Sequence, residues 1–159
     1  MATPQLIVDE AALKQNIQHV QIRLAHAKHL KARLVVKSLA CLDLLKLLSE
    51  QVNTQRFMVF HLPHIVSILE NFAEADILLG KPMPAQAVRH FFDRHTEWSN
   101  TKIQWLIDSK QRLQQYLEIA QLYSLCLDVN IEIDVGLHRG GVQSTQQLTE
   151  ILKLIQQYP

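Results

Sequence analysis

The sequence predicts an α/β protein in which five parallel strands alternate with helices. Five short apolar runs, rich in β-branched and aromatic residues, start near positions 33, 57, 76, 103 and 129 of the 159-residue chain. Neighbouring starts are therefore roughly 19–27 residues apart (24, 19, 27 and 26), which is room for one strand, one helix and two short loops. The runs are continuous rather than alternating, as expected for parallel strands buried on both faces.

The first two β/α units can be read from hydrophobic periodicity. Residues 10–30 repeat apolar side chains near every 3.6 positions, which predicts an amphipathic helix. The first strand, Arg33–Val36, precedes a leucine-rich helix at about Leu42–Val52, and the second strand, Phe57–Phe60, precedes a helix that Pro63 suits in its first turn. The apolar positions of the first helix are Ala12, Leu13, Ile17, Val20, Ile22 and Leu24.

The third and fourth strands are bounded by turn and capping residues. Asp76–Gly80 reads as a buried strand and leads into Gly80–Pro84, a segment that breaks regular structure. The fourth strand is Ile103–Ile107. Two good N-cap residues, Asp108 and Ser109, precede the next helix, residues 110–125.

The fifth strand, Val129–Val135, is followed by a last helix. Ser144 and Thr145 can cap this helix, which runs to about Tyr158. No linker or low-complexity stretch divides the chain, and one domain is the usual organisation at this length. The sequence therefore predicts one structural unit over residues 1–159.

Two architectures share this alternating pattern, an open doubly wound sheet and a (β/α)8 barrel. Open sheets usually carry a glycine-rich phosphate loop after the first strand, but here that strand ends in Val36-Lys37-Ser38, and the chain has only four glycines. A barrel typically needs ~250 residues. The residues alone thus leave two readings, an open five-stranded sheet or the front part of a longer barrel.

Composition excludes several classes of protein. The formal net charge is +1, which is too low for a nucleic-acid-binding surface built on excess Lys and Arg. No apolar run approaches the ~20 residues of a membrane span, and Asp9 and Glu10 near the N-terminus argue against a signal peptide. Cys41 and Cys126 lie among apolar neighbours and are expected to be reduced, buried thiols. These features predict a cytoplasmic protein without membrane or nucleic-acid partners.

Lys37 is the most informative single residue. It follows the first apolar strand directly, and barrel enzymes place their catalytic groups at the C-terminal ends of strands. A lysine amine in such a place can act as a nucleophile that forms a Schiff base with a carbonyl compound. The alternative is a lysine that begins a solvated loop.

The fifth strand leads into a second group of candidates. Strand alternation would place Glu132 and Asp134 on one face, where carboxylates need partners because buried charge is costly. Arg139 can pair with one of them or contact an anionic ligand oxygen. Three of the four glycines, Gly136, Gly140 and Gly141, allow close approach of the backbone to a ligand. The alternative is a loop with an ordinary structural ion pair.

Other strand ends carry weaker candidates. His61 and His64 have a spacing that can bind a metal, but no carboxylate or cysteine completes a ligand set nearby, so no metal site is predicted. His61 can still face the same site as Lys37. Lys81 is a second amine at a strand end, and Asp108 is expected to act as a helix cap.

Taken together, these segments resemble the N-terminal part of pyridoxal-phosphate enzymes of the alanine racemase fold type (fold type III), in the D-threonine aldolase-like and D-serine dehydratase-like branch. The resemblance spans nearly the whole chain. It rests on Thr3–Asp9 with Ala12-Leu13 and Asn16-Ile17, on Arg33–Ser38, on Asp76–Gly80 with Pro82, and on Glu132–Gly136 with Arg139 and Gly141-Val142.

The resemblance implies a partial (β/α)8 TIM barrel of about five β/α units, with parallel strands and outer helices. The remaining barrel strands and a C-terminal β domain would lie after residue 159. Lys37 would hold pyridoxal 5′-phosphate as a Schiff base and act as a general base when released. Arg139 would lie near the phenolic oxygen of the cofactor, with Glu132 and Asp134 as supporting groups and His61 as a further cofactor contact.

The implied activity is that of an amino-acid aldolase, racemase or dehydratase acting on a D- or hydroxy-amino acid. A homodimer is implied, and a divalent metal in the full-length family, with its ligands outside this chain. Two alternatives stay open. The chain can be a non-catalytic half-barrel that binds pyridoxal phosphate weakly or self-associates, or an unrelated open α/β binding module.

Overall fold

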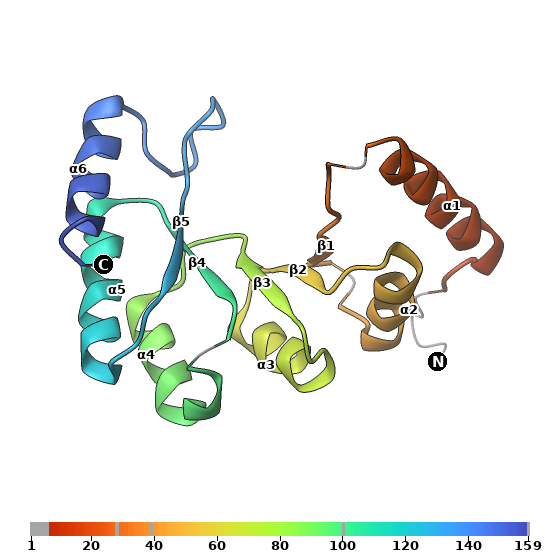
Figure 1. Ribbon diagram of the computed structural model, residues 1–159, viewed down its shortest axis with the longest axis horizontal. Helices are drawn as coiled ribbons and strands as arrows, with labels where there is room; N and C mark the ends of the chain where they lie inside the picture. The colour runs from red at the N-terminus through yellow and green to blue at the C-terminus, as the bar shows by residue number, and fades with distance from the viewer. Residues whose placement is uncertain (1–6, 28, 39, 100, 159) are drawn as a thin grey trace, which may run out of the picture.

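The computed structural model describes residues 7–27, 29–38, 40–99 and 101–158, and in it five parallel strands form one sheet in chain order (Figure 1). Every neighbouring pair of strands is parallel. Since the order never reverses, the sheet is not doubly wound, and it has the strand order of a (β/α) barrel. The strands are β1 (Leu34–Val36), β2 (Arg56–Val59), β3 (Asp76–Leu79), β4 (Ile103–Ile107) and β5 (Asp128–Ile131).

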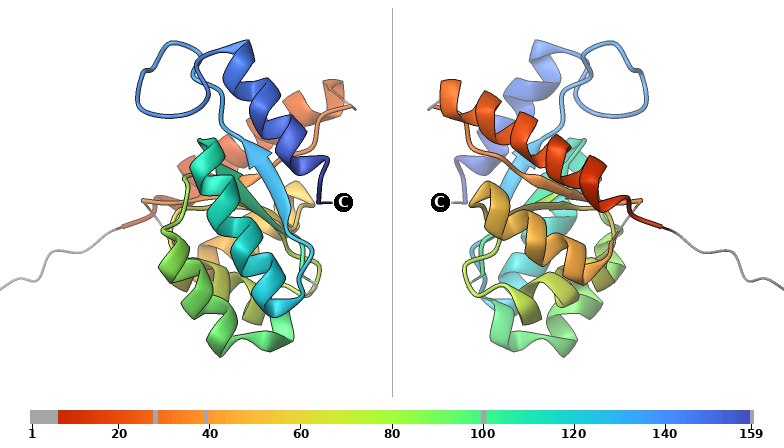
Figure 2. Two further views of the ribbon diagram at one scale, coloured as in Figure 1. Left: turned by 90° about the vertical axis from the view of Figure 1, so that its left-hand side faces the viewer. Right: turned by 90° about the vertical axis from the view of Figure 1, so that its right-hand side faces the viewer.

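Helices connect the strands and cover one side of the sheet. Figure 1 shows α2, α3, α4 and α5 arranged around this side, and the end-on views of Figure 2 show the same layering. No helix in the described part of the chain is long and apolar enough to cross a bilayer. The helices are α1 (Glu10–His26), α2 (Leu42–Val52), α3 (Leu62–Asn71), α4 (Ala85–Arg94), η1 (Thr96–Trp98), α5 (Lys110–Tyr123) and α6 (Thr145–Ile155).

Burial alternates along the central strands. Phe57, Val59, Ile77 and Leu79 point toward the helices and are at most 1% exposed, whereas the residues between them are only partly buried. One face of the sheet therefore forms the core with the helices. The other face, the inner face of the partial barrel, stays partly open to solvent.

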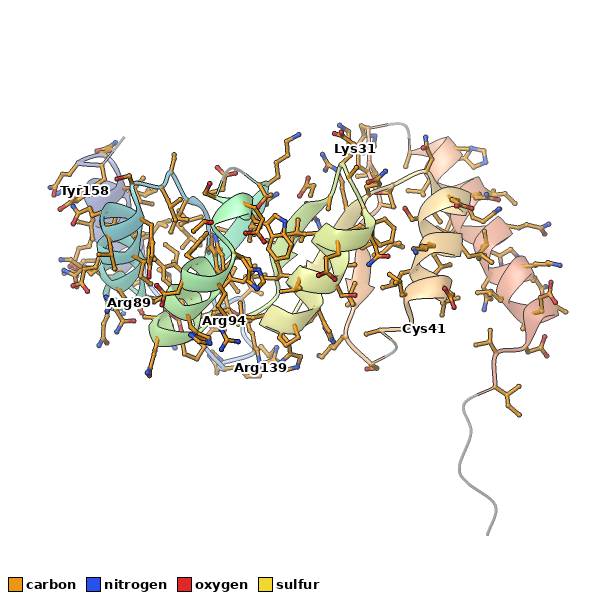
Figure 3. The ribbon with its side chains drawn as sticks, turned by 90° about the horizontal axis from the view of Figure 1, so that it is seen from below. Lys31, Cys41, Arg89, Arg94, Arg139 and Tyr158 are labelled. Atoms are coloured by element: carbon orange, nitrogen blue, oxygen red, sulfur yellow. The ribbon has the colours of Figure 1, made fainter. Side chains whose placement is uncertain are left out.

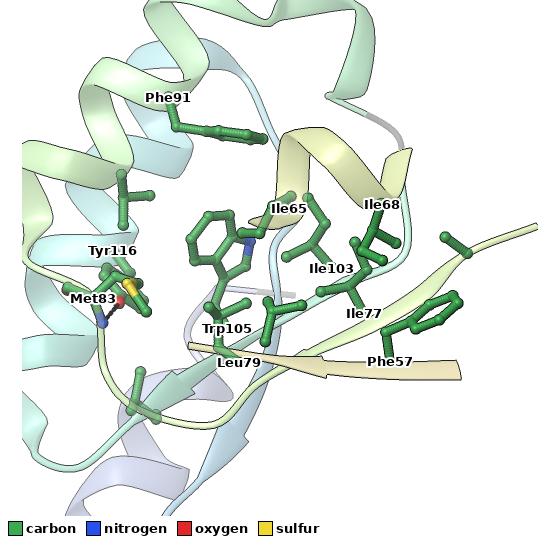
Figure 4. Packing of buried hydrophobic residues seen from close by; sticks show 14 of the residues in the cluster. Phe57, Ile65, Ile68, Ile77, Leu79, Met83, Phe91, Ile103, Trp105 and Tyr116 are labelled. Carbon is green, nitrogen blue, oxygen red and sulfur yellow. Dashed lines mark hydrogen bonds between the residues drawn. The ribbon is translucent and has the colours of Figure 1, made fainter. Parts of the chain in front are cut away.

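The core contains a large aromatic cluster at α4, α5 and β4 (Figure 4). Trp105 and Tyr116 are each 1% exposed, and the Trp105 ring packs edge-on against those of Phe91 and Tyr116. The Tyr116 hydroxyl donates to the carbonyl of Met83 at 2.9 Å and accepts from its amide at 3.0 Å. This pair of bonds fixes the loop that follows β3 to helix α5.

The inner face carries a polar layer near the N-terminal ends of the strands. Arg33 Nη2 lies 2.8 Å from Asp76 Oδ1, which also accepts from Gln104 Nε2 at 2.8 Å. Asn130 Nδ2 continues the row to Gln104 Oε1 at 2.9 Å, and Arg56 Nε lies 3.5 Å from Asp76 Oδ2. Side chains from residues on or beside all five strands thus form one network, which supports the register of the sheet.

The N-caps of α5 and α6 are residues that the sequence predicts, and α1 has a side-chain cap as well. Asp9 Oδ1 accepts from the amide of Ala12, and Ser109 and Ser144 cap α5 and α6 in the same way. The Asp108 carboxylate accepts from the Ser109 hydroxyl at 3.1 Å instead of capping the helix itself.

Besides the expected Asp108 cap, three sequence expectations are wrong. β5 ends at Ile131 rather than Val135, because the backbone turns into a loop held by Asp134. The first helix ends at His26 rather than near residue 30, and of its apolar positions only Ile17 is buried. Cys41 and Cys126 are both exposed, since each lies in a connection at the end of a helix rather than inside one.

Candidate functional site

Lys37 follows the last residue of β1, as the sequence predicts, and its side chain is exposed. Val36, the preceding residue, is 2% exposed and points into the helix-covered core, so alternation directs Lys37 to the inner face. Its Nζ lies 4.9 Å from the centre of the Phe60 ring. No ion pair among the described residues involves Lys37, so no carboxylate competes for this amine there.

Phe60 lies directly after β2, next to Lys37 in the parallel register that pairs Val36 with Val59. Its ring covers Gly80, the residue that follows β3. A Cβ on Gly80 would lie 2.3 Å from Phe60 Cε1 and 2.4 Å from Cζ, which is far too close. Gly80 therefore provides the space for the ring, and the two residues together form a surface beside Lys37.

A loop joins β5 to α6, and its ends are paired. The Asp134 amide donates to the Val142 carbonyl at 3.0 Å, and the Val142 amide donates to the Glu132 carbonyl at 2.8 Å. Gly141 has φ +93°, and a Cβ there would lie 2.9 Å from the Glu132 carbonyl oxygen. Only glycine suits this position, because both the dihedral angle and the space exclude a side chain.

The Asp134 carboxylate organises this loop. Oδ1 accepts from the amides of His138 at 2.9 Å and Gly136 at 3.0 Å, while Oδ2 contacts His138 Nδ1 at 2.9 Å and Gln143 Nε2 at 3.5 Å. The side chain is only 3% exposed. The amides of His138 and Gly136 hold the pKa of this carboxyl below its usual range because they bind the charged form.

Arg139 lies in the outer part of the same loop and is exposed. Figure 2 shows this loop projecting beyond the sheet. In the view of Figure 3, Arg139 and Cys41, four residues after Lys37, lie along the lower edge of the molecule, and Lys31, before β1, lies along the upper edge. The Arg139 loop and the end of β1 therefore share one side of the molecule.

The Glu132 side chain lies against the end of this loop. Its Cγ lies 3.0 Å from the position that a Cβ on Gly141 would take, and its Oε2 lies 3.8 Å from the corresponding position on Gly140. The carboxylate is thus next to the residue that follows Arg139. Alternation from Asn130, which bonds Gln104 on the inner face, directs Glu132 to that face too.

His61 is the residue before α3, and its side chain is exposed and makes no capping bond. Its ring meets that of His64 edge-on, with the ring centres 5.5 Å apart. In the ranges that the structure covers, no group of three His, Cys, Asp or Glu residues could hold a metal ion. Lys81 follows Gly80 and is also exposed.

The topology brings most candidates to one end of the sheet. Lys37, His61 and Glu132 each come after a strand or at its end, and parallel strands place these ends along one edge. Asp134 lies in the same region, but its carboxylate bonds to the amides of its own loop. Phe60 was not singled out from the sequence, although an aromatic residue after one strand and a glycine after the next could have indicated this contact.

Comparison with known proteins gives one family. The sequence model described as alanine racemase, N-terminal domain, matches residues 8–159. No protein with a curated description matches the chain.

Solved structures share the fold. An alanine racemase-like protein from Idiomarina loihiensis superposes with a TM-score of 0.76 at 23% identity, covering 96% of this chain and 40% of that one. A histidine racemase from Leuconostoc mesenteroides gives 0.71 at 19% identity, covering 89% and 37%. An alanine racemase from Oenococcus oeni gives 0.70 at 18% identity, covering 89% and 39%. The chain thus spans about two fifths of each of these proteins.

Proposed function

The chain belongs to the family of the alanine racemase N-terminal domain. We propose that it carries the lysine that holds the cofactor in the active site of a pyridoxal-phosphate enzyme. The observation that carries this proposal is Lys37, an exposed amine on the inner face directly after β1. An amine that no carboxylate pairs among the described residues fits the aldehyde group of the cofactor. Pyridoxal phosphate, when bound, supplies an electron sink for bonds at the α-carbon of an amino acid.

The protein's own groups have distinct tasks in this proposal. Lys37 Nζ would hold the cofactor through its aldehyde group, and as a free amine it would take or give the proton at the substrate α-carbon. Arg139 would offer its guanidinium to an anionic oxygen of the cofactor. Asp134 supports Arg139 by holding its loop, and Glu132 lies beside the same loop. His61, after β2, is a further contact for the cofactor or substrate.

The reaction is proposed as racemisation, aldol cleavage or dehydration of a D- or hydroxy-amino acid. The family match favours a racemase, whereas the resemblance of the opening segment to D-threonine aldolase-like and D-serine dehydratase-like proteins favours the other two. A cytoplasmic homodimer is proposed on the resemblance, together with further barrel strands, a C-terminal β domain and any divalent metal ligands outside residues 1–159.

A second candidate is a half-barrel that binds the cofactor weakly or self-associates without catalysis. The observation that favours it is the exposed sheet edge. β1 pairs only with β2 and β5 only with β4 in the described residues, so each of these two strands has one edge without a strand partner there. Two copies would bring ten strands together rather than the eight of a standard barrel. The molar mass in solution tests it, because self-association requires at least a dimer.

The proposed function is tested by the visible absorption of the protein with pyridoxal phosphate. We expect the wild-type protein to keep a visible absorption band from bound cofactor after gel filtration. The Lys37→Ala variant should lose this band. Lys81→Ala is the matched control, because Lys81 is also an exposed lysine after a strand, and it should keep the band. A band retained by Lys37→Ala would exclude Lys37 as the attachment point.

A further inference from the structure

We propose that Phe60 is a positioning residue for Lys37, with Gly80 as the residue that makes this possible. The proposal rests on the proposed function in one respect, because it concerns how the Lys37 amine is presented to an aldehyde. Its geometric part concerns this chain alone and can be tested without a cofactor.

The Phe60 ring is held in place by its position next to Gly80. Phe60 and Gly80 follow the paired residues Val59 and Leu79 of adjacent strands, so their backbones lie side by side. The ring lies over Gly80 and fills the place of a side chain there. Any residue other than glycine at position 80 would force the ring to move, because its Cβ would lie within 2.4 Å of two ring carbons.

The Phe60 ring also contacts Lys37. The face of an aromatic ring carries negative charge density and attracts a cation within about 6 Å of its centre. Lys37 Nζ lies 4.9 Å from the Phe60 centre, and in the described residues it has no ion pair that would hold it elsewhere. An exposed lysine otherwise samples many rotamers. The ring therefore restricts the amine to the inner face of the sheet, beside the end of β2.

Three variants separate this role from general packing. Phe60→Leu keeps an apolar side chain but removes the ring face. Gly80→Ala keeps the ring but displaces it. Met58→Leu is the matched control, because Met58 is a partly buried residue on the same face of β2.

The first readout is the NMR shift of the Lys37 ε-methylene protons in the protein without cofactor. The ring current of Phe60 should move them upfield of those of Lys81 in the wild-type protein and in Met58→Leu. This displacement should disappear in Phe60→Leu and in Gly80→Ala. Equal shifts for Lys37 and Lys81 in the wild-type protein would overturn the proposal.

The second readout is the ratio of pyridoxal phosphate fixed by borohydride on Lys37 to that fixed on Lys81. We expect this ratio to fall about two- to fivefold in Phe60→Leu, because the uncharged amine that attacks the aldehyde is then spread over more rotamers, and to stay unchanged in Met58→Leu. An unchanged ratio in Phe60→Leu would overturn the positioning role. A wild-type ratio near one, with the ring-current shift present, would instead contradict the proposed function and leave the Phe60–Lys37 contact established.

Discussion

Arg33 and Asp76 are joined across an intervening strand. Arg33 precedes β1 and Asp76 begins β3, yet Arg33 Nη2 lies 2.8 Å from Asp76 Oδ1, and Arg33 Nη1 donates to the Asp76 and Phe57 carbonyls at 2.8 and 3.0 Å. Both side chains are less than a fifth exposed, at 19% and 17%. The pair ties the N-terminal ends of the first three strands together, and Lys37 follows the opposite end of β1.

Asp76→Ala should therefore destabilise the fold strongly. It leaves Arg33 without its carboxylate and removes the partner of Gln104 and Arg56. Breaking a fully buried pair costs about 3–5 kcal/mol, and partial exposure reduces the expected loss here to about 2–3 kcal/mol. Urea unfolding measures it. Glu70→Gln, at an exposed position of α3, should change the free energy of unfolding by less than about 0.5 kcal/mol.

Tyr116→Phe removes the hydroxyl that binds both polar backbone groups of Met83. The loss should be about 1–3 kcal/mol, because both groups are left unsatisfied in a buried place. Tyr158→Phe, at a side chain that is 44% exposed, is the control and should be nearly neutral.

The same tyrosine should contribute to stability at alkaline pH. Burial, the largest cause, raises the pKa of Tyr116 in the folded protein. Its contribution is fully present below the unfolded pKa of about 10 and is lost as pH rises through the higher folded pKa. The wild-type protein should lose more stability above pH ~10 than Tyr116→Phe does. Equal losses in chemical unfolding at each pH would contradict this assignment.

Glycine substitutions in the β5–α6 loop should rank in a definite order. Gly141→Ala combines a positive φ with a clash against the Glu132 carbonyl and should cost at least about 1–3 kcal/mol. Gly136→Ala has a positive φ but open space, so its cost should be smaller. Gly140→Ala should be tolerated, since its nearest contact is an ordinary 3.8 Å. Thermal unfolding of the three variants gives the ranking, and a destabilised Gly140→Ala would contradict it.

Asp134→Asn should loosen the loop that carries Arg139. The asparagine loses the charge that the His138 and Gly136 amides bind, so the bond after Arg139 should be cut by trypsin faster than in the wild-type protein. Asp128→Asn, at an exposed position of β5, is the control. Because the folded pKa of Asp134 is lowered, its contribution is present above the unfolded value of about 3.9 and is lost as pH falls further.

Much of this architecture could be predicted from the sequence. Continuous apolar runs at regular spacing predict five parallel strands, and the structure confirms all five, although in the central strands only the helix-covered face is fully buried. The family is also confirmed, while its D-threonine aldolase-like branch remains a prediction.

Other features depend on contacts that no local pattern shows. Ile133 and Val135 continue the apolar alternation of β5, yet both are exposed. The strand ends before them because the Asp134 carboxylate bonds to amides of the loop that follows. The role of Phe60 depends on Gly80, twenty residues away, and on parallel register. The sequence could therefore indicate which residues of the candidate site lie at strand ends. It could not indicate how these residues are arranged relative to one another.

Peptide mapping after borohydride reduction shows whether Lys37 is the residue to which pyridoxal phosphate attaches. The protein is incubated with pyridoxal phosphate, reduced, digested and analysed by mass spectrometry. The proposed function predicts a phosphopyridoxyl group on the peptide that contains Lys37, in clear excess over the eight other lysines of the chain. Modification spread evenly over the exposed lysines, or concentrated on Lys81, would contradict it.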